Sequence, residues 1–157
     1  MRASVYFAAA IALVASPTSF ALLQSCSVSA SAVSFGPYDP SSSQAKTATG
    51  TVTVSCSVTL VGLFASWTLS LSPGSSATYT NRSLVNGAST LQYNLYTTPS
   101  YSTVWGNGSG ATGVVSDNAL LIVGNNTNTY TVYGRIPPLQ DVRKGNYSDS
   151  IVVTINY

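Results

Sequence analysis

The residues of this chain that could carry out chemistry are few. The chain has no histidine, and its four acidic residues are Asp39, Asp117, Asp141 and Asp149. Without an imidazole, a Ser-His-Asp triad and a histidine-ligated metal site are excluded. The aspartates are far apart along the chain, so the sequence gives no sign of an acid–base pair. We therefore expect no enzyme activity, no cofactor, no metal ion and no small-molecule substrate.

The overall composition indicates a packed β domain. Charged residues make up 6% of the chain, against about 25% in an ordinary globular protein. The net charge of +2 provides no basic patch for a phosphate backbone, so nucleic acid is not an expected partner. The hydrophobic content of 45% is enough for a core, and the abundant Ser, Thr, Tyr and Gly favour strands and turns.

Residues 1–21 have the pattern of a signal peptide. Arg2 supplies a positive charge, Val5–Val14 is an apolar run too short to span a bilayer, and Ser19 and Ala21 are small residues suited to a cleavage site. We expect cleavage after Ala21 and export of residues 22–157 to an oxidising compartment. An uncleaved membrane anchor is the alternative.

The two cysteines, Cys26 and Cys56, are the only ones in the chain. In an exported protein, an isolated pair most simply forms one disulfide. A catalytic thiol pair is the alternative, but neither a Cys-x-x-Cys spacing nor a histidine accompanies these residues. The sequence therefore predicts a structural disulfide.

Alternation of apolar and polar residues marks most of the predicted strands. Five segments alternate clearly, Thr51–Val58, Leu63–Leu71, Leu91–Leu95, Tyr130–Ile136 and Ile151–Tyr157, and two do so more weakly, Cys26–Phe35 and Ala119–Val123. Residues 106–113 and 124–128 are rich in Gly and Asn and are expected to be loops. These six or seven strands, without a helix beyond the signal peptide, predict an antiparallel, Ig-like β-sandwich.

The C-terminal segment Ile151–Tyr157 is unusual because it is apolar, uncharged and followed by no further residue. Exposed edge strands are normally protected by Lys, Pro or a bulge, and this segment has none of them. Either the strand lies between two others, or one of its neighbours is missing from the chain.

Several segments resemble the spore coat protein U domain family, which includes the subunits of archaic chaperone/usher pili. In chain order they are Val33–Asp39, Thr49–Cys56, Asn81–Leu84, Leu91–Tyr96, Tyr133–Pro137 and Gly145–Tyr157. The resemblance implies a sandwich that lacks one strand. A periplasmic chaperone would lend that strand, and a neighbouring pilus subunit would replace it during assembly at an outer-membrane usher.

Within that resemblance, the last strand forms one wall of the groove for the donor strand. The residues expected to contact the inserted strand are Ile151, Val153, Ile155 and Tyr157. Only Leu22–Ser25 lie between the expected cleavage site and Cys26, and four residues span only roughly 13 Å. We therefore expect a terminal or minor subunit, which accepts a strand but donates none.

A secreted adhesive or carbohydrate-binding module is the alternative function. It would use exposed aromatic side chains, of which Tyr101 and Trp105 are the candidates, whereas most aromatics of a sandwich belong to its core. Arg82 and Arg135 could bind an anion, but each is expected to pair with an aspartate, either Asp149 or Asp39.

Overall fold

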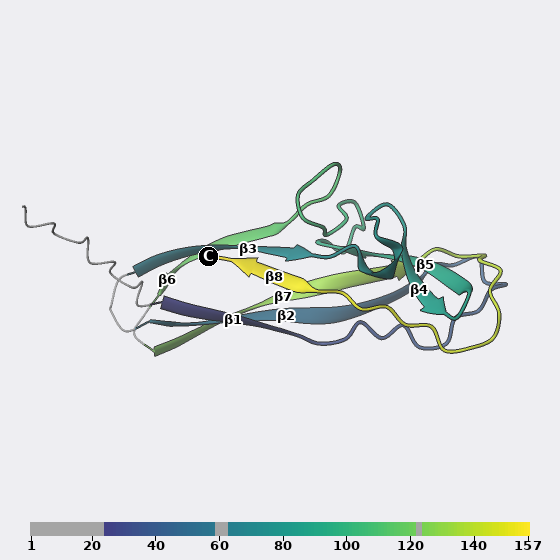
Figure 1. Cartoon of the computed structure of the whole chain (residues 1–157), viewed down its shortest axis with the longest axis horizontal. Coiled ribbons are helices and arrows are strands. Elements are labelled where there is room, and N and C mark those ends of the chain that lie inside the picture. Colours follow the sequence, from purple (N-terminus) through teal and green to yellow (C-terminus); the bar gives the residue numbers. More distant parts are fainter. Residues whose placement is uncertain (1–23, 59–62, 122–123) are drawn as a thin grey trace, which may run out of the picture.

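The computed structural model describes residues 24–58, 63–121 and 124–157, which form two antiparallel β-sheets (Figure 1). The predicted signal peptide, residues 1–21, lies outside the described residues. The described part of the chain has no α-helix, and its one helical element is the short 3-10 turn η1 (Gly74–Ser76). Its strands are β1 (Gln24–Ala30), β2 (Lys46–Val58), β3 (Leu63–Leu71), β4 (Arg82–Asn86), β5 (Ser89–Tyr96), β6 (Val115–Leu121), β7 (Gly124–Ile136) and β8 (Val153–Asn156). The predicted all-β class is confirmed.

The two sheets form the layers of a sandwich. The first has the strand order β1-β2-β7-β5-β4, and the second has the order β6-β3-β8. The long strands β2 and β7 pair over 13 residues each and form the middle of the first sheet. Figure 1 shows β8 beside β3, with the edge strand β1 close to its other side. One edge of each sheet therefore lies on the same flank of the sandwich.

The alternation in sequence decides which side chains enter the core. In β2 the even-numbered residues from Val52 to Cys56 are buried, and in β3 the odd-numbered residues from Ala65 to Leu71 are buried. β5 and β7 contribute the remaining predicted positions, Leu91, Tyr93, Leu95, Val132 and Ile136. Each of these burials agrees with the predicted inward face.

The prediction of a loop over residues 124–128 is wrong. β7 begins at Gly124, and its first residues pair with the end of β2, with Asn125 opposite Ser57 and Asn126 opposite Cys56. Asparagine disfavours strands in general, but here a long partner strand supplies the backbone hydrogen bonds. Tertiary pairing therefore overrides the local preference.

The hairpin of β4 and β5 was not predicted as two strands. Asn86 pairs with Ser89, so the loop between the strands is Gly87 and Ala88, and Gly87 has a φ of 57°. Glycine at the first position of a two-residue loop is a hairpin signal when strands flank it. The signal was missed because β4 does not alternate cleanly: its one buried residue is the charged Arg82.

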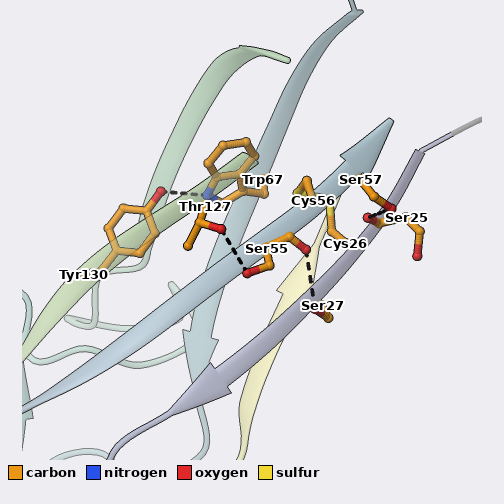
Figure 2. The surroundings of a disulfide bond; sticks show 9 residues. All are labelled: Ser25, Cys26, Ser27, Ser55, Cys56, Ser57, Trp67, Thr127 and Tyr130. Atoms are coloured by element: carbon orange, nitrogen blue, oxygen red, sulfur yellow. Dashed lines mark hydrogen bonds between the residues drawn. A yellow bond between two sulfur atoms is a disulfide. The ribbon is translucent and has the colours of Figure 1, made fainter. Parts of the chain in front are cut away.

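The predicted disulfide joins Cys26 and Cys56, which lie opposite each other on β1 and β2 (Figure 2). Cys56 is buried and Cys26 is half-buried, so the bridge lies at the margin of the core. Because β1 is an edge strand whose one sheet neighbour among the described strands is β2, the disulfide is a covalent attachment of this edge to the sheet.

Hydroxyl side chains cover the outer face of β1, β2 and β7. Thr53 and Thr129 share a hydrogen bond of 3.2 Å between their hydroxyl oxygens, and Ser55 and Thr127 share one of 3.3 Å. Ser27 Oγ also donates to the Ser55 carbonyl at 3.4 Å (Figure 2). The high Ser and Thr content thus belongs to an ordered sheet surface rather than to a disordered segment.

Removal of the disulfide should destabilise the sandwich. The bridge closes a loop with a sequence separation of 30, which corresponds to about 3 to 4 kcal/mol in the chain-entropy account. We expect the double variant Cys26→Ser, Cys56→Ser to lose that much free energy of unfolding in urea titrations relative to the oxidised protein. A difference below about 1 kcal/mol would contradict this expectation.

Candidate functional site: an apolar groove between two sheet edges

The strand β8 has an open edge. In the part of the chain that the structure describes, β8 pairs with β3 alone. The pairing continues back to Val152, whose carbonyl accepts from Ser72 N and whose N–H donates to Ser72 Oγ, both at 2.9 Å. Because backbone groups in a strand point alternately to its two sides, those of Val153 and Ile155 face away from β3. These groups are in position to pair with another strand.

An apolar cavity of about 300 Å³ lies beside this open edge. One side is formed by Ala30–Val33 and Phe35 and the other by Asp149, Ile151 and Val153. We call this cavity the β1–β8 groove. Its remaining lining residues come from the core of the two sheets: Val52, Leu71, Leu84, Tyr93, Leu95 and Val132. A strand laid along β8 would therefore place its inward side chains on the hydrophobic core.

The residues predicted to form the groove wall lie along the open strand. Ile151 and Val153 line the groove, and both are half-buried. Ile155 is half-buried and packs against the core further along β8. Tyr157 is 56% exposed and lies beyond the last residue of β8. The structure thus brings the first three together on one face, with the fourth at its solvent-exposed end.

The opposite wall contains Val33 and Phe35, which the sequence did not identify as groove residues. A Cβ atom added to Gly50 would lie 2.8 Å from Val33, and one added to Gly134 would lie 2.7 Å from both Val33 and Phe35. The ring of Phe35 also packs edge-on against Tyr93 at 6.0 Å. The sequence signal for this wall is the presence of Gly50 in β2 and Gly134 in β7, both on the inward face of the sheet. Because neither glycine has a side chain, the segment with Val33 and Phe35 can pass close to the sheet there.

Asp149 fixes the segment that leads into β8. Its Oδ1 accepts from Ser75 N at 2.9 Å and Ser75 Oγ at 2.6 Å, and its Oδ2 accepts from the Tyr93 hydroxyl at 2.8 Å. Burial, together with the hydrogen bond to Asp149, raises the pKa of Tyr93 well above its ordinary value. Tyr93 therefore stays protonated and keeps donating to the carboxylate, which holds one end of the groove wall in place.

Arg82 supports the same wall from inside the protein. Its side chain is completely buried, and both Nε and Nη2 donate to the Ser72 carbonyl, at 3.1 and 2.8 Å. Nη1 donates to Asn94 Oδ1 at 2.8 Å and Nη2 donates to the Trp105 carbonyl at 2.7 Å. Burial lowers the pKa of Arg82. The prediction that Arg82 forms an ion pair with Asp149 is wrong, because the guanidinium donates instead to the neutral oxygens of Ser72, Asn94 and Trp105.

Comparison with known proteins identifies the family. Residues 12–154 match the Spore Coat Protein U domain. The chain belongs to this family. A search of curated protein sequences found no match.

A solved structure shares the fold of this Spore Coat Protein U domain. It is the CsuC–CsuE chaperone–tip adhesion subunit pre-assembly complex from the archaic chaperone–usher Csu pili of Acinetobacter baumannii. One of its chains superposes with a TM-score of 0.58 at 19% sequence identity. The match covers 86% of this chain but 40% of the other, so the present chain spans about two fifths of that relative.

The two aromatic residues proposed for adhesion, Tyr101 and Trp105, do not form an exposed patch in this Spore Coat Protein U domain. Trp105 is completely buried, and its Nε1 donates to the Leu69 carbonyl at 3.0 Å. Trp105 therefore belongs to the core, which corrects its candidacy as a surface residue. Tyr101 is half-buried between the ring of Tyr96, at 5.4 Å, and the guanidinium of Arg135, at 5.5 Å. Arg135 thus stacks on an aromatic ring and does not form the expected ion pair.

The acidic residues of the domain have separate local roles. Asp39 accepts from the backbone N–H and hydroxyl of Ser41, and these hydrogen bonds lower the pKa of Asp39. Asp117 accepts from the Tyr130 hydroxyl, which in turn accepts from Trp67 Nε1 (the latter bond is drawn in Figure 2).

Among the described residues, no group of three or more His, Cys, Asp or Glu could hold a metal ion. The same residues include no helix long and apolar enough to cross a membrane.

Replacement of Arg82 should destabilise the Spore Coat Protein U domain strongly. Arg82→Ala removes the donor to the Ser72 and Trp105 carbonyls and one of the two donors to Asn94 Oδ1. We expect a loss of about 3 to 5 kcal/mol in the free energy of unfolding. Arg135→Ala is the matched control, because Arg135 is exposed and should cost less than about 1 kcal/mol. If denaturant titrations gave the same loss in free energy of unfolding for both variants, the hydrogen bonds of Arg82 would contribute no more to stability than the exposed Arg135 does.

Proposed function

We propose that this Spore Coat Protein U domain is a structural subunit of a surface pilus or coat assembled by the chaperone–usher route. In this proposal it accepts a β-strand, first from a periplasmic chaperone and then from another pilus subunit, with an outer-membrane usher as the assembly site. The observation that carries the proposal is the β1–β8 groove, where an open strand edge lies beside an apolar cavity that reaches the hydrophobic core. Family membership supports the same conclusion.

The proposed partner strand would supply two kinds of interaction. Its backbone would pair with the groups of Val153 and Ile155 that face away from β3, which is the β-augmentation mode of recognition. Its inward side chains would cover the core along the groove. Four or five such side chains correspond to roughly 6 to 15 kcal/mol at about 1.5 to 3 kcal/mol each. That range is comparable to the net stability of a whole domain, about 5 to 15 kcal/mol.

The disulfide and the predicted signal peptide support export to an oxidising compartment. We infer that the subunit folds in the periplasm and is displayed on the cell surface. A structural role in a fibre or coat requires neither a cofactor nor a bound substrate. Catalysis therefore has no part in the proposed function.

The first test is the substitution Val153→Asp. A carboxylate at this position would enter the apolar groove without a partner, so capture by the periplasmic chaperone and surface display should both be lost. Val152→Asp is the control, because Val152 is the adjacent residue, is 63% exposed and lies outside the groove lining. The measurements are co-purification with a tagged chaperone and antibody labelling of intact cells. Normal assembly of the Val153→Asp variant would place the acceptor surface elsewhere.

The second test is expression of the subunit without a partner. An uncovered groove should leave the oxidised protein aggregation-prone, whereas co-expression of the chaperone should give a soluble complex with slow unfolding. Sedimentation of periplasmic extracts and unfolding kinetics of the complex measure the two outcomes. A monomeric protein that unfolds cooperatively and reversibly with no partner present would contradict strand acceptance.

A further inference from the structure

The β1–β8 groove continues beyond the end of β8 into a larger cavity. This second cavity has a volume of about 880 Å³ and lies between residues 32–40 and residues 142–149. It shares Ala32, Val33, Phe35, Leu84 and Asp149 with the β1–β8 groove. A bound strand that follows β8 toward its N-terminal end therefore reaches this cavity next. We call it the end cavity.

The charges of the two cavities are distributed unevenly. Asp149 is the one Asp, Glu, Lys or Arg among the residues that line the β1–β8 groove, and its carboxylate already accepts from Ser75 and Tyr93. The end cavity adds Arg143 and Lys144, both exposed at its rim. No ion pair joins either cation to a carboxylate of the described chain. Asp141 precedes the lining residue Val142, and Asp39 lies between the lining residues Tyr38 and Pro40, but neither aspartate lines the cavities.

From this arrangement we propose that the partner strand carries one or more acidic residues at the end that lies over the end cavity. This inference rests on the proposed function and specifies the chemistry of the donor. The partner is a polypeptide segment with alternating apolar residues followed by Asp or Glu, which would pair with Arg143 and Lys144. A basic residue in that place would meet two like charges, so the same contacts would also reject strands of the wrong charge.

The expected size of this preference is moderate. Arg143 and Lys144 are solvent-exposed, and each exposed ion pair is weak and screened by salt. Two such pairs correspond to a difference of roughly three- to thirtyfold in Kd between an acidic and a neutral strand. Apolar burial along β8 would thus provide most of the affinity, and the end cavity would provide register and selectivity.

The test uses labelled synthetic peptides with one apolar alternating core and a variable end. The end carries two Asp, two Ser or two Lys residues, placed in one series at the N-terminus and in another at the C-terminus, because either strand direction can fit the groove. The oxidised chain is refolded with each peptide, and Kd is measured by fluorescence anisotropy at low and high salt. We expect the acidic peptide of one series to bind most tightly and the basic one most weakly, with the difference reduced at high salt.

A charge-reversed variant provides the control for position. Arg143→Glu with Lys144→Glu should reverse the order of the acidic and basic peptides. Lys46→Glu with Arg135→Glu changes the net charge equally but lies outside both cavities, so it should leave the order unchanged. Equal binding of acidic and basic peptides at low salt would overturn the inference while leaving strand acceptance intact. Failure of every peptide to bind would overturn the proposed function as well.

Discussion

The rest of this structure depends on one unpaired strand edge. Among the residues that the structure describes, β8 has a hydrogen-bonded neighbour on one side only, and an apolar cavity lies beside its other side. An unpaired, uncharged edge next to apolar side chains favours association with another chain, and natural sheets normally protect such edges. Here the edge carries no Lys, Pro or charged residue. The proposed acceptance of a partner strand would account for this exposure.

Side chains cannot pack across an open groove, so the wall that contains β8 depends on hydrogen bonds to the rest of the protein. Arg82 binds the Ser72 carbonyl, and Ser72 in turn holds Val152. Asp149 ties the same segment to Ser75 and Tyr93. These polar contacts have fixed geometry, which apolar packing alone does not provide. They hold this wall in position along the open edge of β8.

The sequence predicted the all-β sandwich, whereas the contact of Ile151, Val153, Ile155 and Tyr157 with an inserted strand stays a prediction. The failures of the sequence analysis have physical causes. Period-two alternation identified β2, β3, β5 and β7, because one face of each strand is buried. The same rule failed for residues 124–128, where pairing with β2 overrides the preference of asparagine for turns, and for β4, whose buried residue is Arg82. The wall containing Val33 and Phe35 was missed because its position depends on Gly50 and Gly134, which are distant in sequence and meet only in the folded sheet.

The position of the disulfide has a consequence for the order of events in maturation. The bridge joins the N-terminal part of β1 to β2, and in the described part of the chain β1 has no second neighbour in its sheet. Without the disulfide, β1 could separate from β2, and a donor strand would then meet a wider and less ordered β1–β8 groove. Under the proposed function, oxidation would therefore have to precede strand capture, because the bridge holds β1 against β2 and so sets the width of the opening beside β8.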